Sequence, residues 1–136
     1  MTTISASVLT AFIGWSLLLL ILMEALRTRL VVKEVALSNA FTPDNANLSP
    51  FMQRLSRAHA NCIEGLPLFG GLLLIAIATD RTSVTDSLAP WFLVARLIQS
   101  SAHLLSLSVP AVNVRFSAFV VQLAIAAYWV WALLVR

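Results

Sequence analysis

Arg57, Asn61 and Glu64 form the clearest chemical pattern in this sequence. They stand at positions i, i+4 and i+7, so on a helix they share one polar face. Arginine presents a planar fork of donors that a carboxylate accepts in a bidentate manner. A guanidinium also lowers the pKa of a nearby thiol and so holds it as a thiolate. This face therefore predicts a site for a small anion with carboxylates, although spacing alone does not identify the ligand.

Three further apolar segments carry polar residues at helical spacing. One segment has a second stripe, formed by Arg96, Gln99, Ser100 and His103. The last segment has Arg115 and Gln122 seven residues apart, and the first ends with Glu24 and Arg27 one turn apart. Together these residues predict a polar cavity that opens to the cytoplasm, with Arg27, Arg57 and Arg115 at its rim.

Glu64 and Arg96 fall at similar depths of their predicted helices, so we expect them to form a structural ion pair. A charge inside hydrocarbon is costly unless it has a partner or faces a wet cavity. Arg57, Asn61 and Glu64 could likewise serve only to hold helices together, because intramembrane polar residues do both.

Other reactive residues have simpler interpretations. Arg115 could be a basic anchor at a helix start. His59 and His103 favour hydrogen bonding over metal ligation, because no third ligand has a suitable spacing, so we expect no metal site. Cys62 lies in an apolar helix and is interpreted as a small, buried and inert residue.

The composition indicates which elements must position these residues. Of the 136 residues, 60% are hydrophobic and only 11% are charged, and the mean hydropathy is +0.90. A soluble domain of this size has too little interior for so many apolar side chains. The net charge of +3 comes from basic residues beside apolar runs, which is typical of membrane flanks and not of a nucleic-acid partner.

We therefore predict an all-α, integral membrane four-helix bundle that forms a single domain over residues 1–136. The helices are expected at about 4–28, 57–79, 87–107 and 114–135. The two middle helices span only if they carry Glu64 and Arg96 into the membrane. The turn formers Ser49 and Pro50 are assigned to the long connection before the second helix.

Basic residues predict the orientation of the chain. Six flank the first and third connections and two flank the opposite side, and Arg96 lies within a helix. The long connection is thus expected in the cytoplasm and both termini outside. The first apolar run is too long for a usual signal core, so we expect a multi-pass protein retained in a membrane, with a bacterial inner membrane favoured.

Residues 54–69, RLSRAHANCIEGLPLF, resemble a signature of the membrane-associated proteins in eicosanoid and glutathione metabolism. The core Arg-Ala-His-x-Asn-x-x-Glu is similar to that of the microsomal glutathione transferases, whereas Asn-Cys-x-Glu-x-x-Pro-Leu-Phe is more similar to the leukotriene synthase branch. Ala95-Arg96, followed by Pro110, Asn113 and Arg115, gives a second match. The resemblance covers roughly residues 24–122.

The resemblance implies a homotrimer that binds glutathione, as co-substrate, between neighbouring subunits near the cytoplasmic side. It implies that Arg115 is catalytic and stabilises the glutathione thiolate. The glutathione contacts expected from it are Arg27, Arg57, His59, Asn61, Glu64 and His103. His103 stands where many members have tyrosine, and Gly65 stands where the leukotriene branch has an aromatic residue.

The function implied is a glutathione-dependent transferase or peroxidase that acts on lipophilic electrophiles arriving from the lipid bilayer. The alternative is a non-catalytic lipid-binding or scaffolding member of the same family, and the departures at Gly65 and His103 motivate it. A small transporter subunit is disfavoured because the chain has no inverted repeat.

Overall fold

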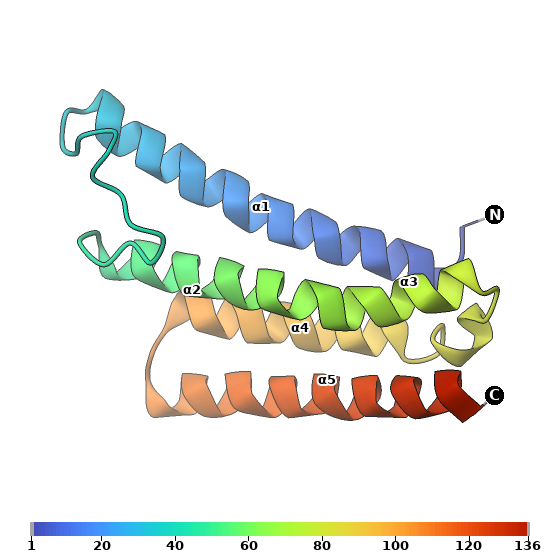
Figure 1. Ribbon diagram of the computed structural model, residues 1–136. Coiled ribbons are helices and arrows are strands. Elements are labelled where there is room, and N and C mark those ends of the chain that lie inside the picture. The colour runs from blue at the N-terminus through green and yellow to red at the C-terminus, as the bar shows by residue number, and fades with distance from the viewer. Residues whose placement is uncertain (1, 136) are drawn as a thin grey trace.

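The computed structural model describes residues 2–135 and is all-helical over them. Its elements are α1 (Ile4–Val32), α2 (Pro50–Gly65), the π-helical turn η1 (Leu66–Gly70), α3 (Gly71–Ala78), the 3-10 turn η2 (Thr82–Val84), α4 (Ala89–Leu105) and α5 (Val109–Val135). Because α2, η1 and α3 follow one another without a break, the chain forms four helical rods that lie side by side (Figure 1).

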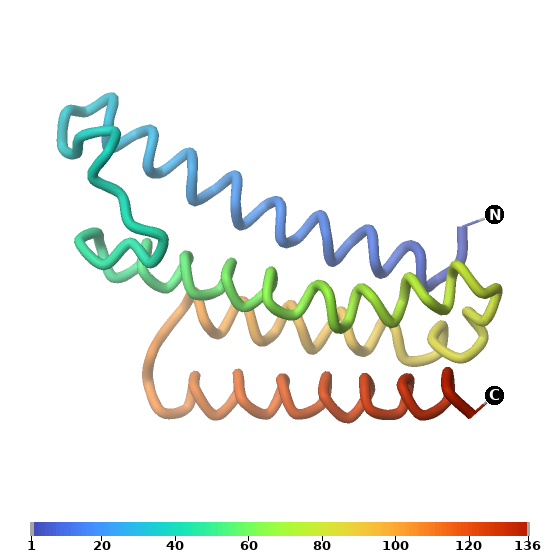
Figure 2. Tube along the Cα trace, viewed as in Figure 1, coloured from blue at the N-terminus to red at the C-terminus, as the bar shows by residue number. Residues whose placement is uncertain are grey.

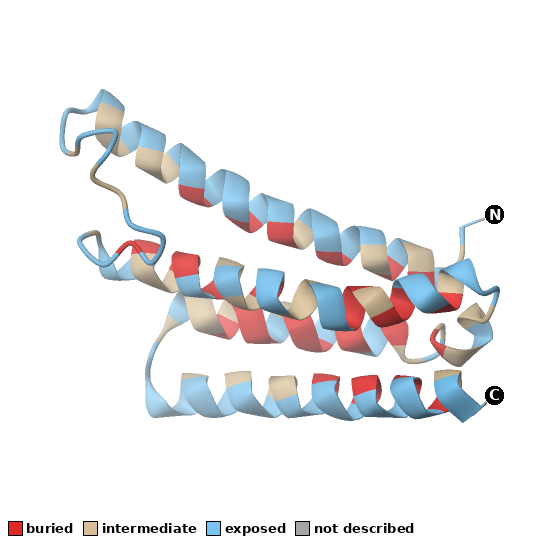
Figure 3. Cartoon of the chain, in the orientation of Figure 1, coloured by how far each residue is buried: buried red, intermediate tan, exposed pale blue. Residues whose placement is uncertain are grey.

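Three rods are long and apolar enough to cross a membrane: Ile4–Val32, Pro50–Ala78 and Val109–Val135. A crossing needs about 20 apolar residues. Many large apolar residues of these rods are exposed. The buried positions lie mainly on the helix faces that are turned toward neighbouring rods (Figure 3). The chain is therefore an integral membrane protein, as its composition predicts.

An aromatic cluster holds the rods together in the interior. Phe92 of α4 packs edge-on against Phe12 of α1, with ring centroids 5.4 Å apart. Phe69 of η1 lies 4.9 Å from Phe92, and Trp129 of α5 lies 6.0 Å from it. All four side chains are fully or almost fully buried, so each rod contributes one ring to a shared core.

The bundle has two distinct ends. At one, here called the terminal end, α1 begins, α5 ends and residues 79–88 connect α3 to α4 (Figure 1). At the other, the loop end, residues 33–49 connect α1 to α2. The Cα trace shows α1 close to α3 at the terminal end and diverging from α2 toward the loop end (Figure 2).

Residues 33–49 bridge the resulting space through a buried side chain, Asn45. Its backbone has φ of 55°, a left-handed conformation that asparagine tolerates better than most residues. Its Oδ1 accepts hydrogen bonds from Arg27, and its Nδ2 donates to the Met52 carbonyl at 2.8 Å. Asn45 thereby ties the connection to both α1 and α2.

Two helices begin earlier than predicted, and for the same reason. α2 begins at Pro50, where the Ser49 side chain accepts a hydrogen bond from Met52 N, instead of at about residue 57. α5 begins at Val109, with Ser108 Oγ accepting from Ala111 N, instead of at about residue 114. Serine at the N-cap followed closely by proline starts a helix, so Ser49-Pro50 opens α2 and does not form a separate turn.

Candidate functional site

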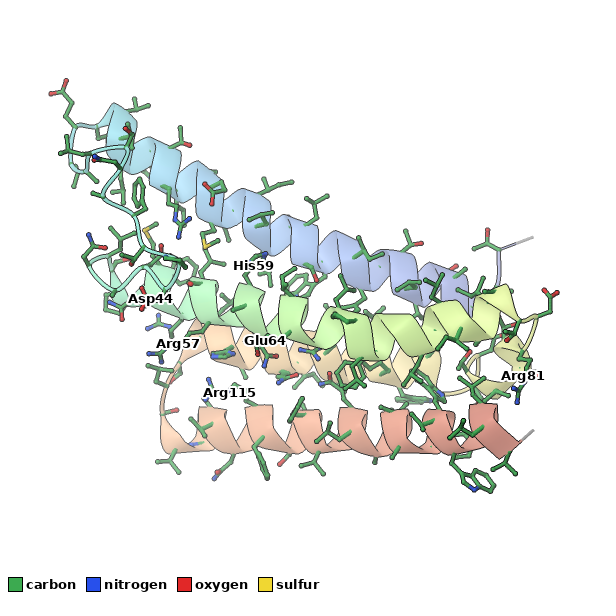
Figure 4. The ribbon with its side chains drawn as sticks, in the orientation of Figure 1. Asp44, Arg57, His59, Glu64, Arg81 and Arg115 are labelled. Atoms are coloured by element: carbon green, nitrogen blue, oxygen red, sulfur yellow. The ribbon has the colours of Figure 1, made fainter. Side chains whose placement is uncertain are left out.

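The polar residues of α2 point to opposite sides of the helix. Glu64 projects from α2 toward α5, and Arg115 projects from α5 toward α2, whereas His59 faces α1 (Figure 4). One chain therefore does not form the single cavity that was expected, with Arg27, Arg57 and Arg115 at its rim. The candidate residues instead line separate cavities at the loop end, and two of these lie on opposite sides of α2.

The first, here called the α1 cavity, lies between α1, α2 and the start of the long connection. Its volume is about 460 Å³, and it is lined by Met23, Arg27, Phe41, Thr42, Pro43, Ser56, His59, Ala60 and Ile63. His59 Nε2 is buried here and has no hydrogen-bond partner within residues 2–135. His59 is thus the polar side chain of this cavity with an unused nitrogen.

Arg27 also lines the α1 cavity, but its guanidinium is already engaged. Its Nη1 pairs with Glu24 at 3.0 Å, and its Nε and Nη2 donate to Asn45 Oδ1 at 3.1 and 2.6 Å. Nη2 also donates to the Thr42 carbonyl, and the guanidinium carbon lies 5.5 Å from the centre of the Phe41 ring. In this arrangement, Arg27 anchors the long connection.

The second cavity, here called the α5 cavity, has a volume of about 290 Å³. It is lined by Asn61, Gln99, His103, Val112, Arg115, Phe116 and Phe119. Three helices, α2, α4 and α5, supply its polar groups, because α5 packs mainly on α4 and leaves the facing side of α2 open. Arg115 is half-buried and forms neither a hydrogen bond nor an ion pair with any described side chain.

The expected ion pair between Glu64 and Arg96 does not form. Arg96 Nη1 donates instead to Asn61 Oδ1 at 2.6 Å. Across residues 2–135, Arg27–Glu24 is the one ion pair. The expectation rested on depth along each helix, but Arg96 approaches the side of α2 that bears Asn61 and Gly65, while Glu64 is exposed toward α5.

Aromatic rings stabilise the buried Arg96 in place of a carboxylate. Arg96 is 1% exposed, and its guanidinium carbon lies 5.4 Å from the centre of the Phe12 ring and 5.3 Å from that of Phe69. A cation over such ring faces is attracted by the negative face of the π-system. Gly65 leaves room for it, because a Cβ there would lie 2.7 Å from Arg96 Nη2.

A pair of buried glutamines, which the sequence patterns place among the polar residues of the predicted cavity, joins α4 to α5 at the α5 cavity. Gln122 Nε2 donates to Gln99 Oε1 at 2.8 Å and to the Ala118 carbonyl at 3.1 Å. Gln99 is 4% and Gln122 is 0% exposed. The polar stripes on α4 and α5 contained both residues, but only three-dimensional packing places them in contact.

Other candidate residues have ordinary roles or no partner. Cys62 is buried, with Sγ 3.4 Å from Ser100 Oγ. His103 lines the α5 cavity, and its Nδ1 is buried without a partner among the described residues. No group of three His, Cys, Asp or Glu side chains within residues 2–135 is placed to hold a metal ion. Arg57 is exposed at the loop end (Figure 4).

The model of the MAPEG family matches residues 5–135, nearly the whole chain. No curated protein and no solved structure matches the chain.

Proposed function

Since the chain belongs to the MAPEG family, we propose that it is a membrane-bound, glutathione-dependent transferase or peroxidase that acts on lipophilic electrophiles. The observation that carries this proposal is the α5 cavity, where Arg115 of α5 faces Asn61 of α2 without a partner of its own. An unpartnered guanidinium in a site with limited water attracts an anion more strongly than one in bulk solvent.

In the proposed reaction, Arg115 holds the sulfur of glutathione as a thiolate. Asn61 binds the backbone of glutathione. Arg57 pairs with one of its two carboxylates, and Glu64 pairs with its ammonium group. His59 and His103 supply further hydrogen bonds. The thiolate attacks an electrophilic carbon that reaches the site from the bilayer; a carbon–sulfur bond forms, and the leaving group departs with the electron pair of its broken bond.

A homotrimer would complete the site, and the split around α2 supports this arrangement. Small-molecule sites usually measure about 300–1,000 Å³, so the α5 cavity of about 290 Å³ is at the lower limit for a whole tripeptide. Exposed apolar faces on α1 and α5 leave area for neighbouring subunits as well as lipid. The α1 cavity of one subunit, with His59 and Arg27, would meet the α5 cavity of the next.

All four rods would cross the membrane, with the loop end in the cytoplasm. α4 has 17 residues, which at 1.5 Å each gives about 25 Å. It packs between the longer rods and therefore lies at the same depth. The excess of basic residues at the loop end supports this orientation, and a bacterial inner membrane would suit it.

A glutathione titration of the detergent-solubilised protein tests the proposal, with thiolate formation followed by ultraviolet absorbance. We expect saturable binding and a thiolate signal at a pH where free glutathione gives little. Turnover with an aryl halide or a lipid hydroperoxide then distinguishes the transferase from the peroxidase. No saturable binding and no turnover of either acceptor would refute the enzymatic proposal.

An apolar groove favours a second candidate, a non-catalytic lipid-binding protein. Its volume is about 340 Å³, and it is lined by Leu9, Ile13, Leu66, Pro67, Gly70, Gly71 and Leu74. The groove suits an acyl chain and contains none of the charged groups at the loop end. Lipid binding that survives in Arg57→Ala and Glu64→Ala, without glutathione turnover in the wild type, would favour this candidate.

A further inference from the structure

The carbonyl oxygens of both amides that line the α5 cavity are already occupied. Arg96 has only donors, so the oxygen of Asn61 must face it, as the 2.6 Å hydrogen bond from Nη1 to Oδ1 requires. The amide is planar with oxygen and nitrogen on one carbon, so this bond fixes the whole group. The Asn61 nitrogen has no partner within residues 2–135, and Asn61 lines the cavity.

Gln99 is oriented in a similar way, with its oxygen toward a protein donor, by two successive hydrogen bonds of Gln122. The Ala118 carbonyl accepts only, so the nitrogen of Gln122 must face it. The same nitrogen lies 2.8 Å from Gln99, which must therefore present its oxygen to Gln122. The Gln99 nitrogen has no partner among the described residues, and Gln99 also lines the cavity.

We propose that Arg96 and Gln122 are positioning residues that turn the amide nitrogens of Asn61 and Gln99 toward the α5 cavity, so that the cavity selects an ionised carboxylate. Arg115, which the proposed function assigns to the thiolate, lines the same cavity and can also only donate, and His103 contributes a buried Nδ1 that has no partner among the described residues. No carboxylate lines the cavity, and Glu64, one turn beyond Asn61, is exposed outside it. This inference rests on the proposed function, since it assigns one carboxylate of glutathione to this cavity.

Burial makes these orientations persistent. Arg96 is 1% and Gln122 is 0% exposed, so neither can exchange its protein partner for bulk water. A buried donor or acceptor that loses its partner is costly, and turning either amide would leave Arg96 or Gln122 facing a donor. The cavity would thus be ready to bind a carboxylate before the ligand arrives.

Asn61→Asp and Gln99→Glu test the inference with little change in shape. Each keeps the oxygen that accepts from Arg96 or Gln122 and replaces the cavity-facing nitrogen with an acceptor. We expect the wild type to prefer glutathione over glutathione diethyl ester, in which both carboxylates are neutral. Each variant should lower glutathione affinity about tenfold or more and change ester affinity little, because hydrogen bonds to charged groups are strong.

Gln122→Met tests the positioning role itself, since it removes the donor that orients Gln99 and keeps a similar volume. The ratio of glutathione to ester affinity should fall about threefold, less than in the direct variants, because one of two amides loses its orientation. Asn39→Asp is the matched control, because it adds the same charge on an exposed residue of the long connection. It should keep the wild-type ratio.

The outcomes separate this inference from the function on which it rests. A wild type that binds neither compound refutes the proposed function. A wild type that binds both equally, or Asn61→Asp and Gln99→Glu variants that retain the wild-type ratio, refutes the selection of a carboxylate by these two amides and leaves glutathione dependence standing. A Gln122→Met ratio equal to that of the wild type refutes the positioning role of Gln122.

Discussion

The two ends of the bundle differ in whether key charged side chains have hydrogen-bond partners. At the terminal end, Asp86 Oδ1 accepts from Ser5 N at 2.8 Å and from Ser5 Oγ at 2.6 Å, at the start of α1. Arg81 donates to the Leu133 and Ala132 carbonyls at 2.7 and 2.9 Å, near the end of α5. At the loop end, Arg57, Glu64 and Arg115 form no side-chain hydrogen bond or ion pair with any described residue.

This difference distinguishes charges that stabilise the fold from charges available for a ligand. The first amides and last carbonyls of a helix lack partners within the helix, and the terminal end supplies those partners from a short connection. The loop end also has anchoring contacts, since Arg54 donates to the Leu104 carbonyl of α4 at 2.9 Å and Arg27 binds Glu24 and Asn45, but Arg57, Glu64 and Arg115 stay free of such contacts among the described residues. Substitutions at the two ends should therefore affect different measurements.

The largest effect is expected at the loop end, from Arg115→Ala. Removal of one preorganised group that stabilises a developing or bound anion typically lowers turnover about 100- to 1,000-fold. We expect a loss of this size in glutathione turnover, with little change in thermal unfolding, because Arg115 has no partner in the described part of the chain. Steady-state kinetics and a melting curve of the same preparation measure both effects.

Arg29→Ala is the control for Arg115→Ala. It removes an equal charge from the same end of the bundle, at an exposed position in the last turn of α1. Its turnover should stay within about twofold of the wild type, because a single exposed charge is largely screened. A similar loss in both variants would mean that general basic charge, and not the position of Arg115, supports the activity.

The sequence predicted which residues belong to the loop end better than how they face one another. Helical periodicity correctly predicted that Arg57, Asn61 and Glu64 share one helix, α2, and that Arg96 of α4 lies at a similar level along the bundle. The rotation of one helix against its neighbour depends on packing. Here Gly65 leaves space for the Arg96 guanidinium, which binds Asn61 and does not pair with Glu64. Spacing along one helix does not contain that information.

The fold itself was more predictable, because the bilayer constrains it. The all-helical character and the membrane class follow from apolar runs alone. The starts of α2 and α5 were misplaced because Ser49-Pro50 and Ser108 with Pro110 also occur in turns. The N-cap hydrogen bond that resolves this ambiguity is made by backbone amides, which every residue type except proline carries.

A smaller effect is expected at the terminal end, from Asp86→Ala. The variant removes the acceptor of the first turn of α1 and should destabilise the protein by about 1 kcal/mol, as the loss of an N-terminal cap does. Thermal unfolding in detergent should shift down by a few degrees, while turnover per folded protein stays unchanged. Ser87→Ala is the control, since Ser87 is exposed in the same connection. Reduced turnover in the folded Asp86→Ala variant would contradict the division between the two ends.

The smallest effect concerns Asp44, at the tip of the long connection. Its Oδ1 accepts from Thr42 Oγ1 at 2.7 Å and from Ala46 N at 3.1 Å. The hydrogen bond from Thr42, and then that from Ala46, lowers the pKa of this carboxyl below its ordinary value of 3.8. A lowered pKa in the folded chain means that ionised Asp44 stabilises the fold above the ordinary value and that this contribution is lost as the pH falls through the lowered one.

Asp44→Ala should therefore speed hydrogen exchange of the Ala46 amide at neutral pH and have no such effect in acid below the lowered pKa. Because Asp44 is fully exposed, global unfolding should hardly change. Asn47→Ala, nearby in the same connection, is the control and should leave the Ala46 amide unchanged. Suppose instead that Asp44→Ala lowered the melting temperature as much as Asp86→Ala does. Charged side chains at the loop end would then stabilise the fold through their hydrogen bonds, as those at the terminal end do. The free charges around the α5 cavity would then need an explanation other than ligand binding.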